Sequence, residues 1–175
     1  YMLRIRSGMR ELTGVLMSRD SVSEQRVVMS KAGLKNNDDS VLYDSSVIKL
    51  ADGTHLTMED IDDNTVSYDG IALSKDADNM IKVVFNNGLQ KTKKLFHEFR
   101  TPKGLSYTLL LPDGTKVYLN SSSTFKLAAN FNESNRTSEL SGEAFFDVAH
   151  QADKPFIVQT KDYAVQVLGT QFNLK

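Results

Sequence analysis

The sequence predicts an all-β protein of short antiparallel strands, arranged as a two-sheet sandwich or roll or as a β-solenoid-like stack, with an N-terminal helix. After residue 47, short runs rich in Val, Ile, Phe and Tyr alternate with Asp-Gly, Asn-Gly, Pro or Asn/Ser turn signals. No long helical pattern separates these runs, which argues against a parallel α/β sheet. Before residue 47, the apolar residues instead follow a helical spacing.

The N-terminal segment carries an amphipathic stripe. Its apolar residues recur at intervals of three and four, which predicts one apolar helix face: Met2, Ile5, Met9, Leu12 and Leu16. Such a stripe docks on the protein's own core, docks on a partner, or continues a helix from further upstream. Residues 18–46 show no clear period, so we assign 1–46 to a helix followed by a linker.

The β-rich part begins at Val47, and its strands are separated by turn residues. The predicted strands span residues 47–50, 55–58, 65–68, 71–73, 81–85, 106–111, 116–120, 124–128, 144–149, 155–160 and 163–168.

An Asp-Gly-Thr turn occurs twice, in LADGTHL from Leu50 and in LPDGTKV from Leu111. In the second copy, proline presets φ for a type I turn, and Gly114 after Asp113 can take the left-handed conformation that completes a bulged hairpin. Asp52 and Gly53 repeat this pattern. We interpret each copy as a hairpin turn and not as an active site, and the repetition suggests two similar β-units packed together.

Composition excludes several classes of function. The formal net charge of −1 produces no global attraction to nucleic acid or to anionic membranes. The absence of cysteine removes disulfides, thiolate metal sites and cysteine nucleophiles. Acidic residues dominate 38–78 and basic residues dominate 82–103, as two solvated faces or as surfaces for separate partners. The basic segment 91–104 interleaves phenylalanines, as single-strand binders do, but it is one short patch.

The histidines do not form a metal-binding pattern. His55, His97 and His150 lie far apart in the sequence, so we expect structural roles for them. An EF-hand is excluded, because Thr65 stands where the calcium loop that would begin at Asp60 requires glycine. A looser ion site formed by the aspartates at positions 60, 62 and 63 remains an alternative.

Two acidic residues, Glu143 and Asp147, flank the phenylalanines of GEAFFDV. In a strand they share one face but lie roughly 13 Å apart, which is farther than either class of glycosidase uses. We therefore expect them on the solvent face of a strand whose Ala144, Phe146 and Val148 point inward.

The second half of the chain contains a more specific series of motifs. LPDGT at 111–115 precedes LNSS at 119–122, GEAFFDV at 142–148, KPFIV at 154–158 and VQVLGTQFN at 165–173. In order and spacing this series resembles the FecR family of bacterial sigma-factor regulators, in particular its Bacteroides-like members. The resemblance is strong over 101–174 and loose over 47–85.

The resemblance implies structural motif residues and no catalytic, cofactor-binding or metal-binding residues. Glycines 114, 142 and 169 would serve backbone turns, and phenylalanines 145, 146, 156 and 172 would serve packing. The implied motif residues are Asp52, Gly53, Asp113, Gly114, Asn120, Gly142, Glu143, Phe146, Pro155, Phe156, Gly169 and Phe172.

The resemblance also implies a role in cell-surface signalling. FecR-like proteins span the inner membrane once, bind an extracytoplasmic-function (ECF) sigma factor in the cytoplasm, and receive a periplasmic signal from a TonB-dependent outer-membrane transducer. This chain would be the periplasmic part of such a protein, a non-enzymatic relay domain without cofactors. The expected domains are 1–46, a juxtamembrane helix and linker, and 47–175, with β-units 47–90 and 101–175.

We expect the domain to be truncated after Lys175, so that the main transducer-binding region and the sigma-binding segment are both absent. Two other functions remain open. A carbohydrate-binding or adhesive module would expose aromatic side chains on one face, although the absence of Trp counts against it. A hydrolase with Glu143 or a nearby aspartate as the acid would place a perturbed carboxylate in a pocket.

Overall fold

Alternation of apolar and polar residues builds two sheets in the part of the chain that can be described. The computed structural model describes residues 47–61, 65–68, 70–78, 80–86, 96–133 and 136–175. All of them belong to the second of the two units into which the chain divides, Asn37–Lys175. The predicted N-terminal helix and linker, residues 1–46, lie outside the described residues. Within those residues no helix has the length and apolar character needed to cross a bilayer.

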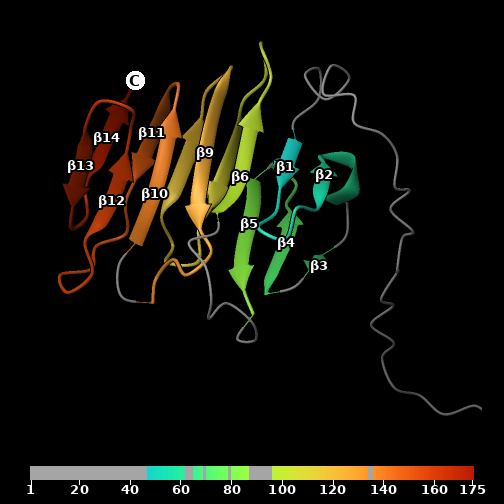
Figure 1. Cartoon of the computed structure of the whole chain (residues 1–175), viewed down its shortest axis with the longest axis horizontal. Coiled ribbons are helices and arrows are strands. Elements are labelled where there is room, and N and C mark those ends of the chain that lie inside the picture. The colour runs from blue at the N-terminus through green and yellow to red at the C-terminus, as the bar shows by residue number, and fades with distance from the viewer. Residues whose placement is uncertain (1–46, 62–64, 69, 79, 87–95, 134–135) are drawn as a thin grey trace, which may run out of the picture. The chain divides into compact units, whose positions relative to one another are not determined.

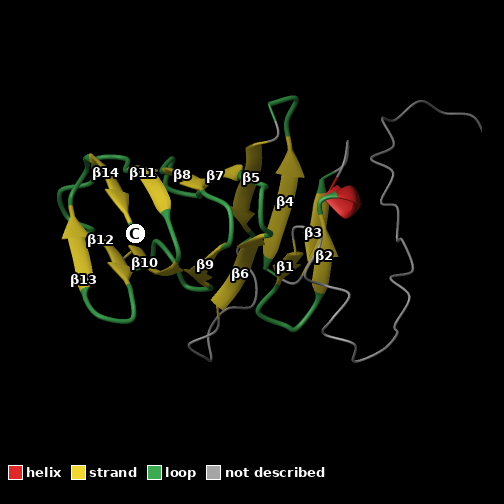
Figure 2. Cartoon of the chain, turned by 90° about the horizontal axis from the view of Figure 1, so that it is seen from above, coloured by secondary structure: helices red, strands yellow, loops and turns green. Residues whose placement is uncertain are grey.

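Each sheet contains seven strands (Figures 1 and 2), which confirms the all-β prediction. Sheet A has the spatial order β13 (Ala164–Val167), β12 (Phe156–Gln159), β10 (Arg136–Ser141), β9 (Ser123–Ala128), β6 (Phe96–Thr101), β1 (Val47–Lys49) and β2 (His55–Thr57). Sheet B has the order β14 (Gln171–Leu174), β11 (Ala144–Asp147), β8 (Lys116–Leu119), β7 (Tyr107–Leu110), β5 (Met80–Phe85), β4 (Ile71–Lys75) and β3 (Val66–Tyr68). A 3-10 helix, η1 (Glu59–Ile61), follows β2.

The sheets are mixed, so the expectation of purely antiparallel strands is wrong. In sheet A, β10 and β12 pair in parallel, and in sheet B, β5 and β7 do so. In both cases the chain leaves one sheet, forms a strand in the other sheet and then returns. β11 separates the first pair in sequence, and β6 separates the second. Such a crossover allows a parallel pair, whereas the short turns visible in the sequence predict only hairpins.

The core lies between the two sheets and is centred on aromatic side chains. Phe146 of sheet B is fully buried, and its ring centroid lies 6.1 Å from that of Phe125 and 6.0 Å from that of Phe156, both in sheet A. Phe172 stacks on Phe146 at 4.9 Å with an interplanar angle of 13°. Ala144 and Val148, like Phe146, are buried, as the alternation in β11 predicts. Figure 2 shows the two layers edge-on.

Three strands, β6, β10 and β14, are absent from the strands predicted by residue pattern. The inward positions of β10 carry Arg136, Ser138 and Leu140, so the apolar alternation that marks a strand is largely missing. In β6 the inward positions are His97, Phe99 and Thr101, and the charged neighbours hide the period. β14 has only four residues, and in the sequence only the FecR-like motif VQVLGTQFN at 165–173 extends into it.

Both Asp-Gly turns form hairpins, which confirms their interpretation. The first connects β1 to β2 in sheet A and the second connects β7 to β8 in sheet B. In each, the backbone NH of the leading leucine donates to the threonine carbonyl, at 2.8 Å for Leu50 and at 2.9 Å for Leu111. Gly53 and Gly114 have φ values of 92° and 87°, in the region where glycine is favoured.

Next to the first Asp-Gly turn, the side chain of His97 is buried. It is 1% exposed, and its Nδ1 accepts a hydrogen bond of 3.3 Å from the backbone NH of Ala51. The ring lies 5.8 Å from that of Phe85, and Nε2 has no protein hydrogen-bond partner. Burial lowers the pKa of His97 from 6.5 to about 4, and the nearby carboxylate of Asp52 only partly opposes that shift. The imidazole is therefore neutral in the folded protein at neutral pH.

This burial predicts acid sensitivity. His97 binds a proton more tightly in the unfolded chain, so its contribution to stability is complete above about pH 6.5 and is lost as the pH falls towards 4. The loss is about 3 kcal/mol of unfolding free energy, which urea titrations between these pH values would measure. The His97→Leu variant is expected to lose this part of the pH dependence, and His55→Gln, at an exposed position, to retain it. Parallel profiles for the wild type and His97→Leu would contradict the prediction.

Candidate functional site

The motif residues of the second half lie at the two ends of the strands and in the core between them. Arg136 organises one end, which we call the Arg136 end. Its buried guanidinium donates from Nη1 to Asp113 Oδ2 at 2.9 Å. The same nitrogen donates to the Ala149 carbonyl at 2.7 Å, Nε donates to the Lys154 carbonyl at 2.8 Å, and Nη2 donates to the Leu168 carbonyl at 3.2 Å. One side chain thereby joins the β7–β8 turn to the connections that precede β12 and β14.

Asp113 is consequently more than a turn residue. Its Oδ1 accepts from the Thr115 backbone NH at 3.0 Å and its Oδ2 accepts from the Thr115 hydroxyl at 2.7 Å. That hydroxyl oxygen in turn accepts from the Ala149 NH at 3.1 Å. Asp52 makes the equivalent bond to the Thr54 NH at 2.8 Å, but in an exposed setting. The two copies of the turn share their geometry, and only the second carries a buried ion pair.

The other predicted residues at the Arg136 end shape the backbone around this ion pair. The carbonyl of Pro155 accepts from the Arg136 NH at 3.2 Å, and the guanidinium carbon lies 5.5 Å from the centroid of the Phe156 ring. Gly169 packs so closely on residue 150 that an added Cβ would lie 2.5 Å from the His150 Cα. A side chain at position 169 would push the turn before β14 away from this end.

Asn120, Gly142 and Glu143 lie together at the opposite end, which we call the Glu143 end. Ser123 joins them, because its hydroxyl accepts from the Glu143 NH at 2.8 Å and donates to the Glu143 carbonyl at 3.1 Å. The Asn120 NH donates to the same carbonyl at 3.0 Å. Thr101 completes the group: its hydroxyl donates to the Asn120 carbonyl and accepts from the Ser123 NH at 3.1 Å.

The side chain of Glu143 points away from the core. Its Oε1 accepts from Asn173 Nδ2 at 3.2 Å, and its Oε2 lies 3.5 Å from Lys175 Nζ. The hydrogen bond from Asn173 and the charge of Lys175 hold the pKa of this carboxyl below its usual value. A general acid needs a raised pKa, so this environment is the reverse of what the hydrolase alternative requires.

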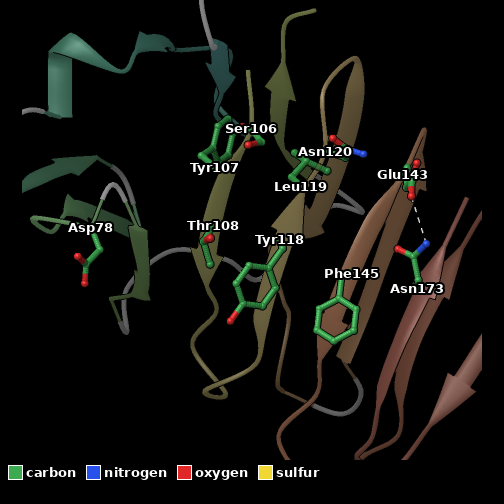
Figure 3. Close-up of a pocket in the computed structure, with 10 residues that line it drawn as sticks. All are labelled: Asp78, Ser106, Tyr107, Thr108, Tyr118, Leu119, Asn120, Glu143, Phe145 and Asn173. Atoms are coloured by element: carbon green, nitrogen blue, oxygen red, sulfur yellow. Dashed lines mark hydrogen bonds between the residues drawn. The ribbon is translucent and has the colours of Figure 1, made fainter. Parts of the chain in front are cut away.

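Glu143 borders a hollow on the outer face of sheet B (Figure 3), with a volume of about 530 Å³. Tyr118 and Phe145 stand side by side in it, with ring centroids 5.6 Å apart and an interplanar angle of 53°. Phe145 was expected to serve packing, but it lies on the outer face and is 38% exposed. Asn120 and Asn173 also line the hollow.

The looser ion site is not assembled by the residues that the structure describes. Asp60 Oδ2 accepts from the NH and the hydroxyl of Thr57, at 2.8 and 3.0 Å. Residues 62 and 63, which carry the other two carboxylates, lie outside the described residues.

Three residues that matter here carry no strong signal in the sequence. Arg136 sits in a polar run, Ser123 ends a serine cluster, and Tyr118 alternates with core residues in KVYL. Only the alternation in β8 could have predicted that Tyr118 points outward.

Replacing Arg136 by methionine is expected to lower the unfolding free energy by about 3–5 kcal/mol, because Asp113 would remain buried without its partner. Urea denaturation measures this loss. The control is Lys126→Met: because Lys126 and Glu139 are 40% and 36% exposed, we expect a change within about 1 kcal/mol. Equal losses of unfolding free energy in the two variants would show that the buried ion pair of Arg136 contributes no more to stability than an exposed pair.

Gly142→Ala is expected to destabilise more than Gly53→Ala. Both glycines have positive φ, of 99° and 92°. A Cβ at 142 would lie 2.8 Å from the Ser123 Cα, whereas a Cβ at 53 meets nothing within 4 Å. The difference in unfolding free energy should be about 1–3 kcal/mol, the cost of forcing atoms into filled space. Equal losses, measured by thermal unfolding, would mean that the Ser123 backbone gives way freely.

Comparisons with known proteins concern mainly this second half. Residues 97–175 match the family described as FecR protein. Two crystal structures of a proposed anti-sigma factor from Parabacteroides distasonis are similar, both at 41% identity, with TM-scores of 0.45 and 0.43. These matches cover 46% and 45% of this chain but only 38% and 37% of the solved chains. No curated protein matches the chain.

The matched residues are those that build the site. They run from β6 to the end of the chain and include the Arg136 network, the Glu143 end and the aromatic core between them. Residues 97–175 of this chain are thus similar to the FecR protein family.

Proposed function

We propose that the chain is the periplasmic signal-relay part of a FecR-like regulator that spans the inner membrane once. In this proposal the regulator receives a signal from a TonB-dependent outer-membrane transducer and passes it to an ECF sigma factor. The observation that carries the proposal is the FecR match over 97–175, which includes both ends of the sandwich.

The packing supports a relay that works as a rigid body. The Arg136 network joins three connections at one end, and the Ser123 hydroxyl joins β9 to the β10–β11 turn at the other. Between them, Phe146 contacts both sheets. A displacement applied at one end of such a body reaches the other end without being absorbed by local deformation.

The partners in this proposal bind outside the described surfaces. The transducer would bind mainly through residues that follow Lys175, and the sigma factor through a cytoplasmic segment. Residues 47–175 would then position these two parts, with 1–46 as the juxtamembrane segment. The matched solved chains extend well beyond the matched region, which is compatible with further parts.

Isothermal titration tests the relay. The chain 1–175, and a form that continues past Lys175, would be titrated with the periplasmic signalling domain of the transducer encoded beside it. We expect the longer form to bind and the shorter form to bind at least about tenfold more weakly, a difference of about 1.4 kcal/mol.

The signalling domain of an unrelated transducer is the control and should bind neither form. Binding of the short form at full strength would place the receiving surface within 1–175. The acidic residues of 38–78 and the basic residues of 82–103 would then be the first positions to mutate. Absence of binding by both forms would contradict the relay.

A further inference from the structure

The outer faces of the two sheets differ in chemistry. On sheet A, Lys126 stands directly opposite Glu98 on one side and Glu139 on the other, and its Nζ lies 3.7 Å from the Glu139 carboxylate. This row of alternating charge is typical of a solvated face. On sheet B, the corresponding region carries the partly exposed rings of Tyr118 and Phe145. Two partly exposed rings in contact on an outer sheet face require an explanation.

The strand register aligns these rings with polar side chains. Thr108, Tyr118, Phe145 and Asn173 stand directly opposite one another on β7, β8, β11 and β14. Since neighbouring strands lie about 4.8 Å apart, this row extends about 14 Å across the sheet. Figure 3 shows its side chains along the hollow.

Beside the rings lie groups that together offer hydrogen-bond donors and acceptors. Asn173 and Asn120 offer amides, Thr108 and Tyr118 offer hydroxyls, and Glu143 offers an ionised carboxylate. The bond from Asn173 Nδ2 to Glu143 Oε1 orients both side chains. Ring faces with fixed donors and acceptors at their edge match a molecule that has C–H faces and hydroxyl edges.

We propose that the hollow on the outer face of sheet B binds a neutral oligosaccharide. The positively polarised C–H groups of a sugar ring would pack on the negative faces of Tyr118 and Phe145, and its hydroxyls would bond to Asn173, Asn120 and Glu143. A volume of about 530 Å³ is that of a small-molecule site and suits a short oligosaccharide. This function goes beyond the relay and does not depend on it.

Charge distinguishes this ligand from other classes. Asp78 and Glu143 line the hollow, and none of the described basic side chains does, which disfavours an anionic sugar or a phosphate. Lys175 already pairs with Glu143, which weakens the attraction for a basic peptide. The polar side chains that line the hollow lie on strands or at strand ends. The sheet register therefore fixes their positions before a ligand binds.

Titration calorimetry of the whole chain with neutral linear hexasaccharides of glucose, xylose and mannose tests the proposal. We expect at least one to bind with a Kd of about 1 mM or tighter. Tyr118→Ala and Phe145→Ala should each weaken binding by about tenfold, and Asn173→Ala should weaken it too. All three positions are exposed, so thermal unfolding should show intact folding.

The matched controls are Tyr163→Ala, at an exposed tyrosine outside the hollow, and Lys126→Ala on sheet A, and both should bind as the wild type does. The proposal is overturned if none of the hexasaccharides binds, if binding survives the loss of both rings, or if only a basic peptide such as hexalysine binds. Because the transducer titration contains no sugar, failure here leaves the relay intact, and failure of the relay leaves this site intact.

Discussion

The buried guanidinium of Arg136 is the constraint on which the second half of this sandwich depends. It uses Nε, Nη1 and Nη2 to hold the carboxylate of the β7–β8 turn and three backbone carbonyls from two later connections. Lysine could not replace it, because an ammonium lacks the planar fork that reaches several fixed acceptors at once. Thr115 in turn holds Asp113. The position of the β7–β8 turn therefore fixes the positions of the two later connections.

The opposite end follows a different principle. There the close packing of Gly142 on Ser123, with backbone bonds around a single hydroxyl, sets where β11 begins. That starting point decides the face on which each residue of β11 lies, because side chains alternate along a strand. Phe146 therefore enters the core, while Glu143 and Phe145 face outward beside Tyr118. The hollow on sheet B is thus a consequence of how tightly the Glu143 end is built.

Particular residues show where sequence reasoning succeeds. Gly53 and Gly114 were placed correctly in hairpins because turn chemistry is local: an aspartate that accepts from the backbone two residues later, followed by a glycine at positive φ. The inward alternation of Ala144, Phe146 and Val148 is local as well. Arg136 was missed because a buried arginine in a polar strand looks like a surface residue until its partners, 13 to 32 positions away in sequence, are known.

The sequence by itself determined the all-β class, the two Asp-Gly hairpins and the similarity of the second half to the FecR family, since each rests on short-range propensity or on an ordered series of motifs. Only the tertiary structure decided the parallel pairs β5–β7 and β10–β12, the ion pair of Arg136 with Asp113, and the row that joins Tyr118 to Phe145. The reason is physical: these features arise from the register and crossing of strands distant in sequence. They are selected by the packing of the whole core and leave no periodic mark on any single segment.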